Sequence, residues 1–454
     1  MRWKGPVLAV LGAAALAVIA ISFSFRGGIS TTFGTTAPRT IAATRPSTSA
    51  GGSTTGTAAL TTGDTTTGDT TTGDTTTIPR SLPVRLGHRL LVATADDALK
   101  QADPAAAASL MKVSHDAGFD GVMVSSMWQR GAKAPSTDER LALGNVVKAA
   151  EAEGMRVFVF VWHGLSGNTP RTVAARRQFA DYTAALAREF PQIRDIVVGN
   201  EPNLNTFWLP QFAPGGRDAA ATGYLDLLAR TYDALKAVSR QIKVIGGALA
   251  PRGSDRPGLK RDTHSPTRFI EDLAAAYKKS GRSKPIMDAF SMHPYMRTSE
   301  LSPTDTHSAS TTITIADYPK LAALLTHAFA GTRQRGAGLP IYYTEFGVQT
   351  RIPADHRHAY TDLNSPSAAD AVTPETQVRY YREALELAAC QPTVKGFFVF
   401  HTFDEVDLAG WQSGLYYADQ KPKASLPDFR LAAASARAAR LTRCTGSKVF
   451  VQKD

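Results

Sequence analysis

The chain has 454 residues, of which 43% are hydrophobic and 20% charged, and its formal net charge is +11. It is too long and too apolar for a disordered tail, and its length suits one large domain or two ordinary ones. Two cysteines exclude a four-cysteine zinc site and a disulfide framework. P-loop, zincin and nucleophile-elbow motifs are absent from the sequence.

The basic residues form no dense block, so we expect no nucleic-acid partner. An acidic glycan or an anionic surface suits the net positive charge better.

The first 26 residues predict a segment that enters a membrane. Arg2 and Lys4 precede an uncharged run from Gly5 to Phe25. The run is longer than the hydrophobic region of a usual signal peptide and has the length of a spanning helix, which favours an uncleaved anchor over a cleaved signal. Cleavage beside the small residues at positions 20 and 22 is the alternative. In either case we expect an extracytoplasmic protein, anchored to the membrane or secreted.

Residues 27–80 form a low-complexity linker, and residues 81–454 form the candidate catalytic domain. The linker contains a five-residue Thr/Gly/Asp repeat at 61–77 and has no residues that bury a core, so we interpret it as a passive tether. Export also bears on the two cysteines. In an oxidising compartment Cys390 and Cys444 are expected to form a disulfide, and two unpaired buried thiols are the alternative.

Short apolar segments of strand character alternate with longer helical segments after Arg89. Strand candidates lie at 89–95, 119–125, 155–162, 193–200, 242–249, 287–293, 339–345 and 394–401. Helical patterns include those at 103–117, 138–153, 172–189, 218–240, 316–335, 375–389 and 426–440. Such alternation indicates parallel strands joined by crossover helices.

Eight strand–helix units predict an α/β fold, a closed (β/α)8 TIM barrel. An open doubly wound sheet is the rival, but no glycine-rich dinucleotide turn follows the first strand. The long connections all follow the carboxyl ends of strands, at 201–216, 250–264, 294–315, 346–373 and 402–424. Because barrels build their active sites at that end, we expect the site there.

Polar and aromatic residues gather at the same strand ends. Candidates for substrate binding are Trp162, His163, Asn200, His293, Tyr295 and His401, together with Trp128, Trp208 and Trp411 from the following loops. A single tryptophan is usually a packing residue, but four near one barrel mouth favour aromatic platforms for a ligand.

Glu201 and Glu345 follow the fourth and seventh strands, so they are expected to face each other across the barrel mouth. Cleavage of a glycosidic bond with retention needs one carboxylate to attack the sugar and a protonated one to assist the leaving oxygen. Two carboxylates about 5 Å apart repel by roughly 3 kcal/mol at an effective dielectric of 20, so one of them tends to keep a proton near neutral pH. Together they are a candidate acid/nucleophile pair.

Several segments resemble the retaining glycoside hydrolases of clan A, the cellulase, β-xylosidase and mannanase group. DIVVGNEPN (195–203) is similar to their fourth-strand Asn-Glu-Pro signature and IYYTEFGVQT (341–350) to their seventh-strand nucleophile segment. FSMHPY (290–295) and GLYYADQKPKAS (414–425) resemble their sixth-strand and closing regions. The resemblance implies the following roles: Glu201 as acid/base, Glu345 as nucleophile, Asn200 as partner of the sugar 2-hydroxyl, Tyr295 as hydrogen-bond donor to the nucleophile, and His293 as a lining residue.

The chain departs from that pattern at two positions. Met123 lies where the clan commonly has an arginine on the second strand, and Phe400-His401 lies where a tryptophan often ends the eighth. We therefore carry two hypotheses: an exported monomeric glycosidase acting on a β-linked carbohydrate, or a noncatalytic surface-tethered glycan-binding barrel. A lyase or transglycosylase is a third.

Neither cofactor nor metal is expected for the leading hypothesis. Asp404, Glu405 and Asp407 have the ligand chemistry for calcium or a sugar, although acidic loop residues are usually solvated. His356 and His358 are expected at the surface without partners.

Overall fold

A computed structural model of the chain describes residues 87–258, 261–364, 369–441 and 444. The predicted membrane segment (1–26) and linker (27–80) lie outside the described residues. In the described part, no helix combines the length and the apolar character that crossing a bilayer requires.

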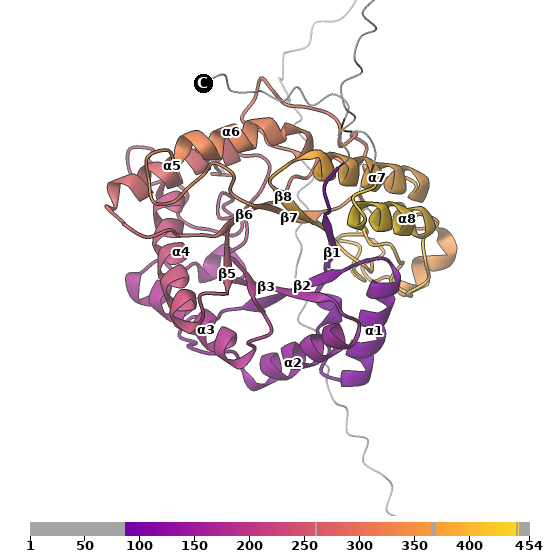
Figure 1. Cartoon of the computed structure of the whole chain (residues 1–454). Helices are drawn as coiled ribbons and strands as arrows, with labels where there is room; N and C mark the ends of the chain where they lie inside the picture. Colours follow the sequence, from indigo (N-terminus) through magenta and orange to yellow (C-terminus); the bar gives the residue numbers. More distant parts are fainter. Residues whose placement is uncertain (1–86, 259–260, 365–368, 442–443, 445–454) are drawn as a thin grey trace, which may run out of the picture. The chain divides into compact units, whose positions relative to one another are not determined.

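Eight parallel strands close into a barrel in the order of the chain, and β8 pairs with β1 (Figure 1). The strands are β1 (Leu91–Ala95), β2 (Gly121–Met127), β3 (Arg156–Trp162), β4 (Asp195–Val198), β5 (Lys243–Leu249), β6 (Ala289–Met292), β7 (Ile341–Phe346) and β8 (Val394–Val399). Each overlaps a predicted strand, so the (β/α)8 prediction is confirmed and the open sheet is wrong.

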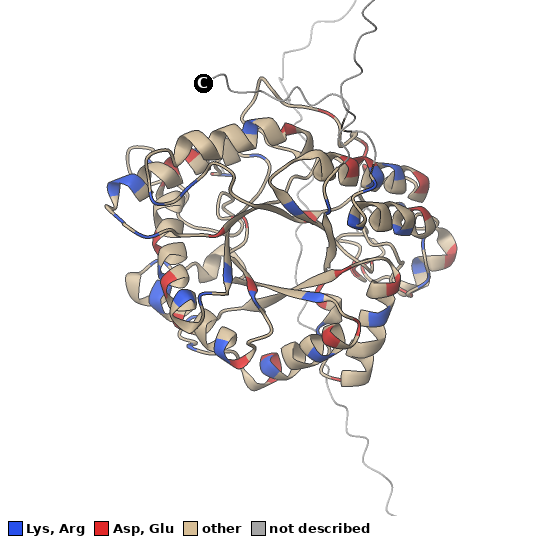
Figure 2. Cartoon of the chain, in the orientation of Figure 1, with Lys and Arg blue, Asp and Glu red and all other residues tan. Residues whose placement is uncertain are grey.

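The helices surround the barrel, and acidic and basic residues are interspersed along them (Figure 2). They are α1 (Pro104–Asp116), α2 (Thr137–Ala152), α3 (Val173–Glu189), α4 (Ala219–Val238), α5 (Pro266–Lys279), α6 (Tyr318–Ala328), α7 (Pro374–Cys390) and α8 (Leu426–Arg437).

Two helices differ from the sequence-based expectation. We did not predict α5, although Ser265 accepts a hydrogen bond from the Arg268 N–H and Pro266 occupies the first turn, a common start signal. Helix α6 ends at Ala328 rather than at 335. The chain turns there, and Gly331 adopts φ +71°, a left-handed conformation that glycine tolerates and that stops a helix.

The barrel interior is a packed apolar core rather than a channel. Phe158 contacts Phe398 edge-on, with ring centroids 4.9 Å apart, and Tyr342 at 5.6 Å. Met123 belongs to the same cluster. A second, larger core lies between the strands and the outer helices. Because the interior is filled, a ligand site has to lie at an end of the barrel.

Cys390, the last residue of α7, forms a disulfide with Cys444. The bond joins two residues separated by 54 positions and ties the chain after α8 back to the barrel. It closes a loop of a length for which cross-linking stabilises the folded state by about 4 kcal/mol in the chain-entropy account.

A buried ion pair ties the long loops after β7 and β8 together. Lys423 Nζ lies 2.7 Å from Asp404 Oδ1, and both side chains are completely buried. Lys423 also donates to Thr350 Oγ1 (2.7 Å), and Tyr360 OH donates to Asp404 Oδ2 (2.8 Å). Burial lowers the pKa of Lys423 and raises that of Asp404, so each charge depends on the other.

We predict that Lys423→Met lowers the free energy of unfolding by roughly 3 to 5 kcal/mol, because it leaves the Asp404 carboxyl buried without its partner. Chemical denaturation at pH 7 measures the loss. Lys421→Met is the matched control, since Lys421 is exposed and lies 3.4 Å from Asp419. Equal stability of the two variants would show that the pair does not anchor the loops.

Candidate active site

The chain turns sharply between β4 and Glu201. Gly199 has φ +83°, and a side chain there would come within 3.1 Å of the Tyr224 ring. Glu201 itself has φ +38°, which is rare for a residue with a side chain and costs on the order of 1 kcal/mol or more. The Glu201 N–H donates to the Ala248 carbonyl at the end of β5 (2.8 Å), which holds this conformation. The acidic side chain is thereby placed at the mouth by two strands.

Glu345 lies near the carboxyl end of β7, and its carboxylate is held from β6. Tyr295 OH, three residues beyond β6, donates to Glu345 Oε2 (3.1 Å). The Tyr295 ring is buried and packs against Trp411, with centroids 5.1 Å apart. An aromatic wall from the loops after β6 and β8 therefore fixes the donor.

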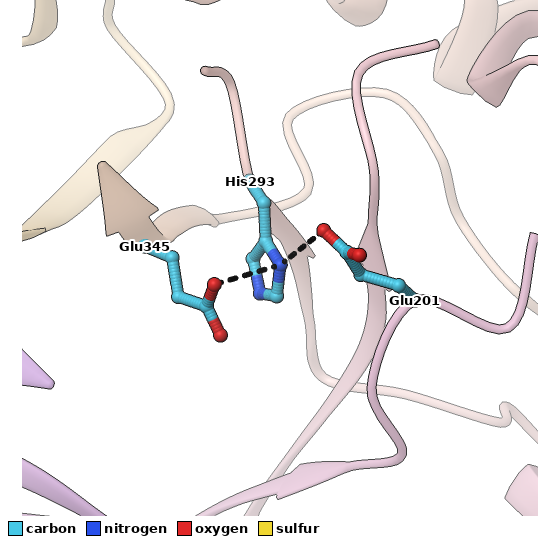
Figure 3. Close-up of side chains that lie close together, drawn as sticks. All are labelled: Glu201, His293 and Glu345. Carbon is cyan, nitrogen blue, oxygen red and sulfur yellow. Dashed lines mark hydrogen bonds and ion pairs between the residues drawn. The ribbon is translucent and has the colours of Figure 1, made fainter. Parts of the chain in front are cut away.

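His293 lies between the two glutamates, as Figure 3 shows. Its Nδ1 is 3.1 Å from Glu201 Oε1 and 3.4 Å from Glu345 Oε2. The nearest oxygens of the two carboxylates and this nitrogen all lie within 4.8 Å of one another. The sequence placed both glutamates at one barrel mouth but did not place the histidine between them.

Burial and the neighbouring charges shift the pKa values of Glu345 and His293, so the protonation of each group depends on the others. Burial raises the pKa of Glu345 to about 7; the Glu201 carboxylate adds to this, whereas His293 and the Tyr295 hydrogen bond oppose it. Burial alone would lower the pKa of His293, but the Glu345 and Glu201 carboxylates outweigh it and raise that pKa above its ordinary value. Near neutral pH the site thus keeps a proton available between two carboxylates.

The described residues contain two groups with the chemistry of metal ligands. One is the Glu201, His293 and Glu345 site, and the other consists of Asp218, His264 and Asp272. In the second group His264 Nε2 lies 3.1 Å from the Gln211 carbonyl and 3.4 Å from Asp218, contacts that hydrogen bonding within the protein explains. The expectation of a metal-free protein stays a prediction.

The four tryptophans divide into two pairs. Trp128 and Trp208 are 0% and 2% exposed. Trp128 donates to the Ala132 carbonyl and packs edge-on against Phe179, while Trp208 packs against His163 and Tyr224. The interpretation of Trp128 and Trp208 as ligand platforms is wrong, because helices and loops cover both rings.

The other two tryptophans retain some exposure, which is 8% for Trp162. Trp162 ends β3, and its indole Nε1 is buried without a hydrogen-bond partner. Trp411 is half-buried beside Tyr295 and Phe400. A buried donor without a partner is costly, so a ligand oxygen would be a favourable partner for Trp162.

The remaining predicted binding residues differ in accessibility. His163 and His401 are buried, and burial lowers the pKa of His163 to about 4 and that of His401 to about 3, so both are neutral at pH 7. Each has an Nδ1 without a partner. His163 packs edge-on against Trp208. Asn200 is partly exposed directly before Glu201.

Two expectations about loop residues need correction. Asp404 is neither solvated nor open to calcium, because Lys423, Tyr360 and the Gly414 N–H take its oxygens. His356 has partners: it lies 3.0 Å from Asp419 and stacks on Tyr417 at 3.9 Å between ring centroids.

Sequence reasoning missed Arg252, which follows β5 by three residues. Its position directly after a barrel strand, in ALAPRGSD, is the signal that would have identified it. Glu405, after β8, also has a perturbed environment, and burial raises its pKa to about 8.

No protein-family model matches the chain, and no curated protein is significantly similar to it in sequence. Solved structures that align with it include the GH39 enzyme from Xanthomonas axonopodis pv. citri, with 16% identity, TM-score 0.49 and coverage of 79% of this chain and 72% of that one. A monomeric beta-xylosidase from Caulobacter crescentus aligns with 16% identity and TM-score 0.49, over 76% and 69% of the two chains. A beta-glucosidase from Thermotoga maritima aligns with 14% identity and TM-score 0.48, over 72% and 86%.

Those three names fall within the glycoside hydrolases, the class that the two glutamate segments resemble. At such low identity the likeness concerns only the barrel. The activity of this chain is therefore argued below from its own residues.

We predict that Glu345 makes the folded state less stable as the pH rises. Its pKa is about 7 in the folded protein against 4.5 ordinarily, so the folded state binds this proton more tightly than the unfolded state does. The resulting contribution to the free energy of unfolding is lost as the pH rises from about 4.5 through 7. The shift corresponds to on the order of 3 kcal/mol. His293, whose pKa is also raised, acts in the same direction.

Glu345→Gln removes this dependence. The difference in free energy of unfolding between the variant and the wild-type protein should grow in favour of the variant from pH 4.5 to 8, as measured by denaturant titration. Glu151→Gln, at an exposed position of α2, is the control and should follow the wild-type protein. A constant difference for Glu345→Gln would contradict the burial argument.

Proposed function

We propose that the barrel is a retaining glycoside hydrolase that cleaves a β-linked oligosaccharide or polysaccharide. The observation that carries the proposal is the approach of the Glu201 and Glu345 carboxylates to within 4.8 Å at the carboxyl end of the barrel. Retaining enzymes hold their carboxyl groups about 5 to 5.5 Å apart, whereas inverting enzymes hold them about 6.5 to 9.5 Å apart to admit a water molecule. The β-linkage is drawn from the resemblance of the two glutamate segments alone.

In the first step a Glu345 oxygen attacks the anomeric carbon while the glycosidic C–O bond breaks. The departing oxygen takes a proton from Glu201. Tyr295 donates a hydrogen bond to Glu345 Oε2, and His293 Nδ1 lies 3.4 Å from the same oxygen; both favour the ionised form of Glu345, which the attack requires. Because burial favours a proton on Glu345 in the free protein, substrate binding has to leave the shared proton on Glu201.

In the second step Glu201, now a carboxylate, takes a proton from water. The water oxygen attacks the anomeric carbon and releases Glu345, so that both carboxyl groups regain their starting states. His293 contacts both carboxylates and therefore offers one cationic partner to whichever is ionised.

We also propose that the barrel works outside the cytoplasm. The Cys390–Cys444 disulfide supports this location, because such bonds persist mainly in oxidising compartments. The uncharged run at 5–25 after Arg2 and Lys4 supports it independently.

Substitution of each glutamate should produce different kinetic defects. Glu345→Ala removes the nucleophile and should abolish hydrolysis. Glu201→Gln should slow hydrolysis by about 100- to 10,000-fold with poor leaving groups, and less with a nitrophenyl leaving group that needs no proton. Release of reducing ends from a panel of β-glycans measures both, and Glu151→Gln is the control.

Azide distinguishes the two roles. It should replace water in Glu201→Ala and yield a glycosyl azide of retained configuration, whereas in Glu345→Ala it should attack the substrate directly and yield the inverted azide. The opposite pattern would exchange the roles. Glycan binding without any released product, unaltered in both variants, would instead support the noncatalytic barrel, and unsaturated products would indicate a lyase.

A further inference from the structure

Two arginines follow β5 and β6, the strands that lie between β4, which leads to Glu201, and β7, which carries Glu345. Arg252 comes three residues after β5, and Arg297 comes five residues after β6. The end of β5 accepts two backbone hydrogen bonds from the site. The Ala248 carbonyl accepts from the Glu201 N–H (2.8 Å), and the Leu249 carbonyl accepts from the His293 N–H (3.0 Å). Backbone hydrogen bonds therefore join the segment that carries Arg252 directly to Glu201 and His293.

The backbone next to Arg252 is also held firmly. The Asn203 side chain bonds both to the Ala250 carbonyl (3.1 Å) and to the Ala250 N–H (3.0 Å), and the Pro251 carbonyl accepts from the Ile313 N–H (3.0 Å). Asn203 itself comes two residues after Glu201 and is completely buried. The base of the Arg252 side chain thus has a defined position relative to Glu201.

The Arg252 side chain is partly exposed, but one nitrogen of its guanidinium has an unusual environment for a cation. Its Nη1 is buried and has no hydrogen-bond partner, and no carboxylate of the described residues lies within 4.0 Å of either Arg252 or Arg297. Burial lowers the pKa of Arg252, the Arg297 guanidinium lowers it further, and the Glu201 carboxylate opposes both. Arginine nevertheless stays protonated in proteins, so the cost of this arrangement is not relieved by loss of a proton.

Among the described residues, no carboxylate pairs with the Arg252 guanidinium and offsets the cost of its unpartnered Nη1. Glu201 directs an oxygen to His293 instead, at 3.1 Å. A guanidinium offers donors in a planar fork that fits carboxylate and sulfate oxygens two at a time. An anionic group of a ligand would accept from the Arg252 guanidinium. Its negative charge would also reduce the repulsion between Arg252 and Arg297.

We propose that Arg252, with Arg297 beside it, forms a subsite for the acidic group of a negatively charged sugar, a uronic acid or a sulfated residue. The inference rests on the proposed glycosidase function and names its substrate class. Arg252 acts as the specificity-determining residue because it is the less exposed of the two and has the buried Nη1 without a partner. Arg297, which is exposed, adds attraction at longer range.

The test compares substrates that differ only in charge. Nitrophenyl β-glucosides and β-galactosides are paired with the corresponding uronides, which carry a carboxylate on the exocyclic carbon, and with the sulfate esters at the same carbon. We expect kcat/KM to favour an anionic member over its neutral partner, and Arg252→Gln to reduce that ratio roughly 10- to 100-fold, the effect of losing a charged hydrogen-bond pair. Arg252→Lys should restore only part of the ratio because an ammonium lacks the fork.

Arg256→Gln is the matched control, since it removes the same charge from an exposed position in the same loop. It should leave the ratio of anionic to neutral turnover unchanged. Comparable loss of the ratio in both arginine variants would mean that net charge, not a subsite, sets the preference, and would overturn the proposal. The uronide and sulfate arms identify which acidic group the subsite prefers.

Calorimetric binding of the same pairs to Glu345→Gln separates this inference from the proposed function. Preferential binding of an anionic member, without hydrolysis of any glycan by the wild-type protein, would refute the glycosidase and support the subsite. Hydrolysis of neutral glycosides, with no anionic preference in binding or turnover, would refute the subsite and leave the glycosidase standing. Failure of every anionic member to bind also counts against the subsite.

Discussion

Two carboxylates within 4.8 Å of each other in a largely buried site repel strongly, and the rest of the site is arranged around that repulsion. At an effective dielectric near 20 it is worth roughly 3 kcal/mol, about a quarter of the stability of a robust domain. His293 reduces the cost because its Nδ1 lies between the two groups, and a proton shared by the pair reduces it further. In the proposed mechanism, the same conditions that make the pair costly supply an acid and a nucleophile together.

The barrel makes this arrangement possible by dividing its tasks among strands. The interior is filled with apolar side chains, so the polar groups are confined to the ends. Glu201 follows β4 and Glu345 lies on β7, while the segment after β6 supplies both His293 and Tyr295. β5 has a supporting role: its end accepts backbone hydrogen bonds from Glu201 and His293. The first of these bonds holds Glu201 in its unfavourable left-handed conformation. Strain at that residue is balanced by the surrounding strands.

The positive charge near the glutamates comes from unexpected positions. Clan A enzymes, which the glutamate segments resemble, commonly carry an arginine on the second strand, but here Met123 is part of the apolar interior. His293 after β6 contacts the carboxylates directly, and Arg252 after β5 acts on Glu201 from farther away. The departure from the pattern therefore changes which strands supply the cations and leaves the glutamate pair intact.

By itself the sequence determined the eight strands, most of the outer helices and the meeting of Glu201 with Glu345. Alternating apolar segments specify strands locally, and parallel strands in a barrel all end at one mouth. It did not determine which side chains are open to that mouth. Trp128 directly follows the last residue of β2, yet its ring is completely buried, because exposure depends on helices and loops distant in the sequence. The position of His293 between the glutamates and the unpaired Arg252 were likewise decided only by tertiary structure, since both follow from the packing of strands far apart along the chain.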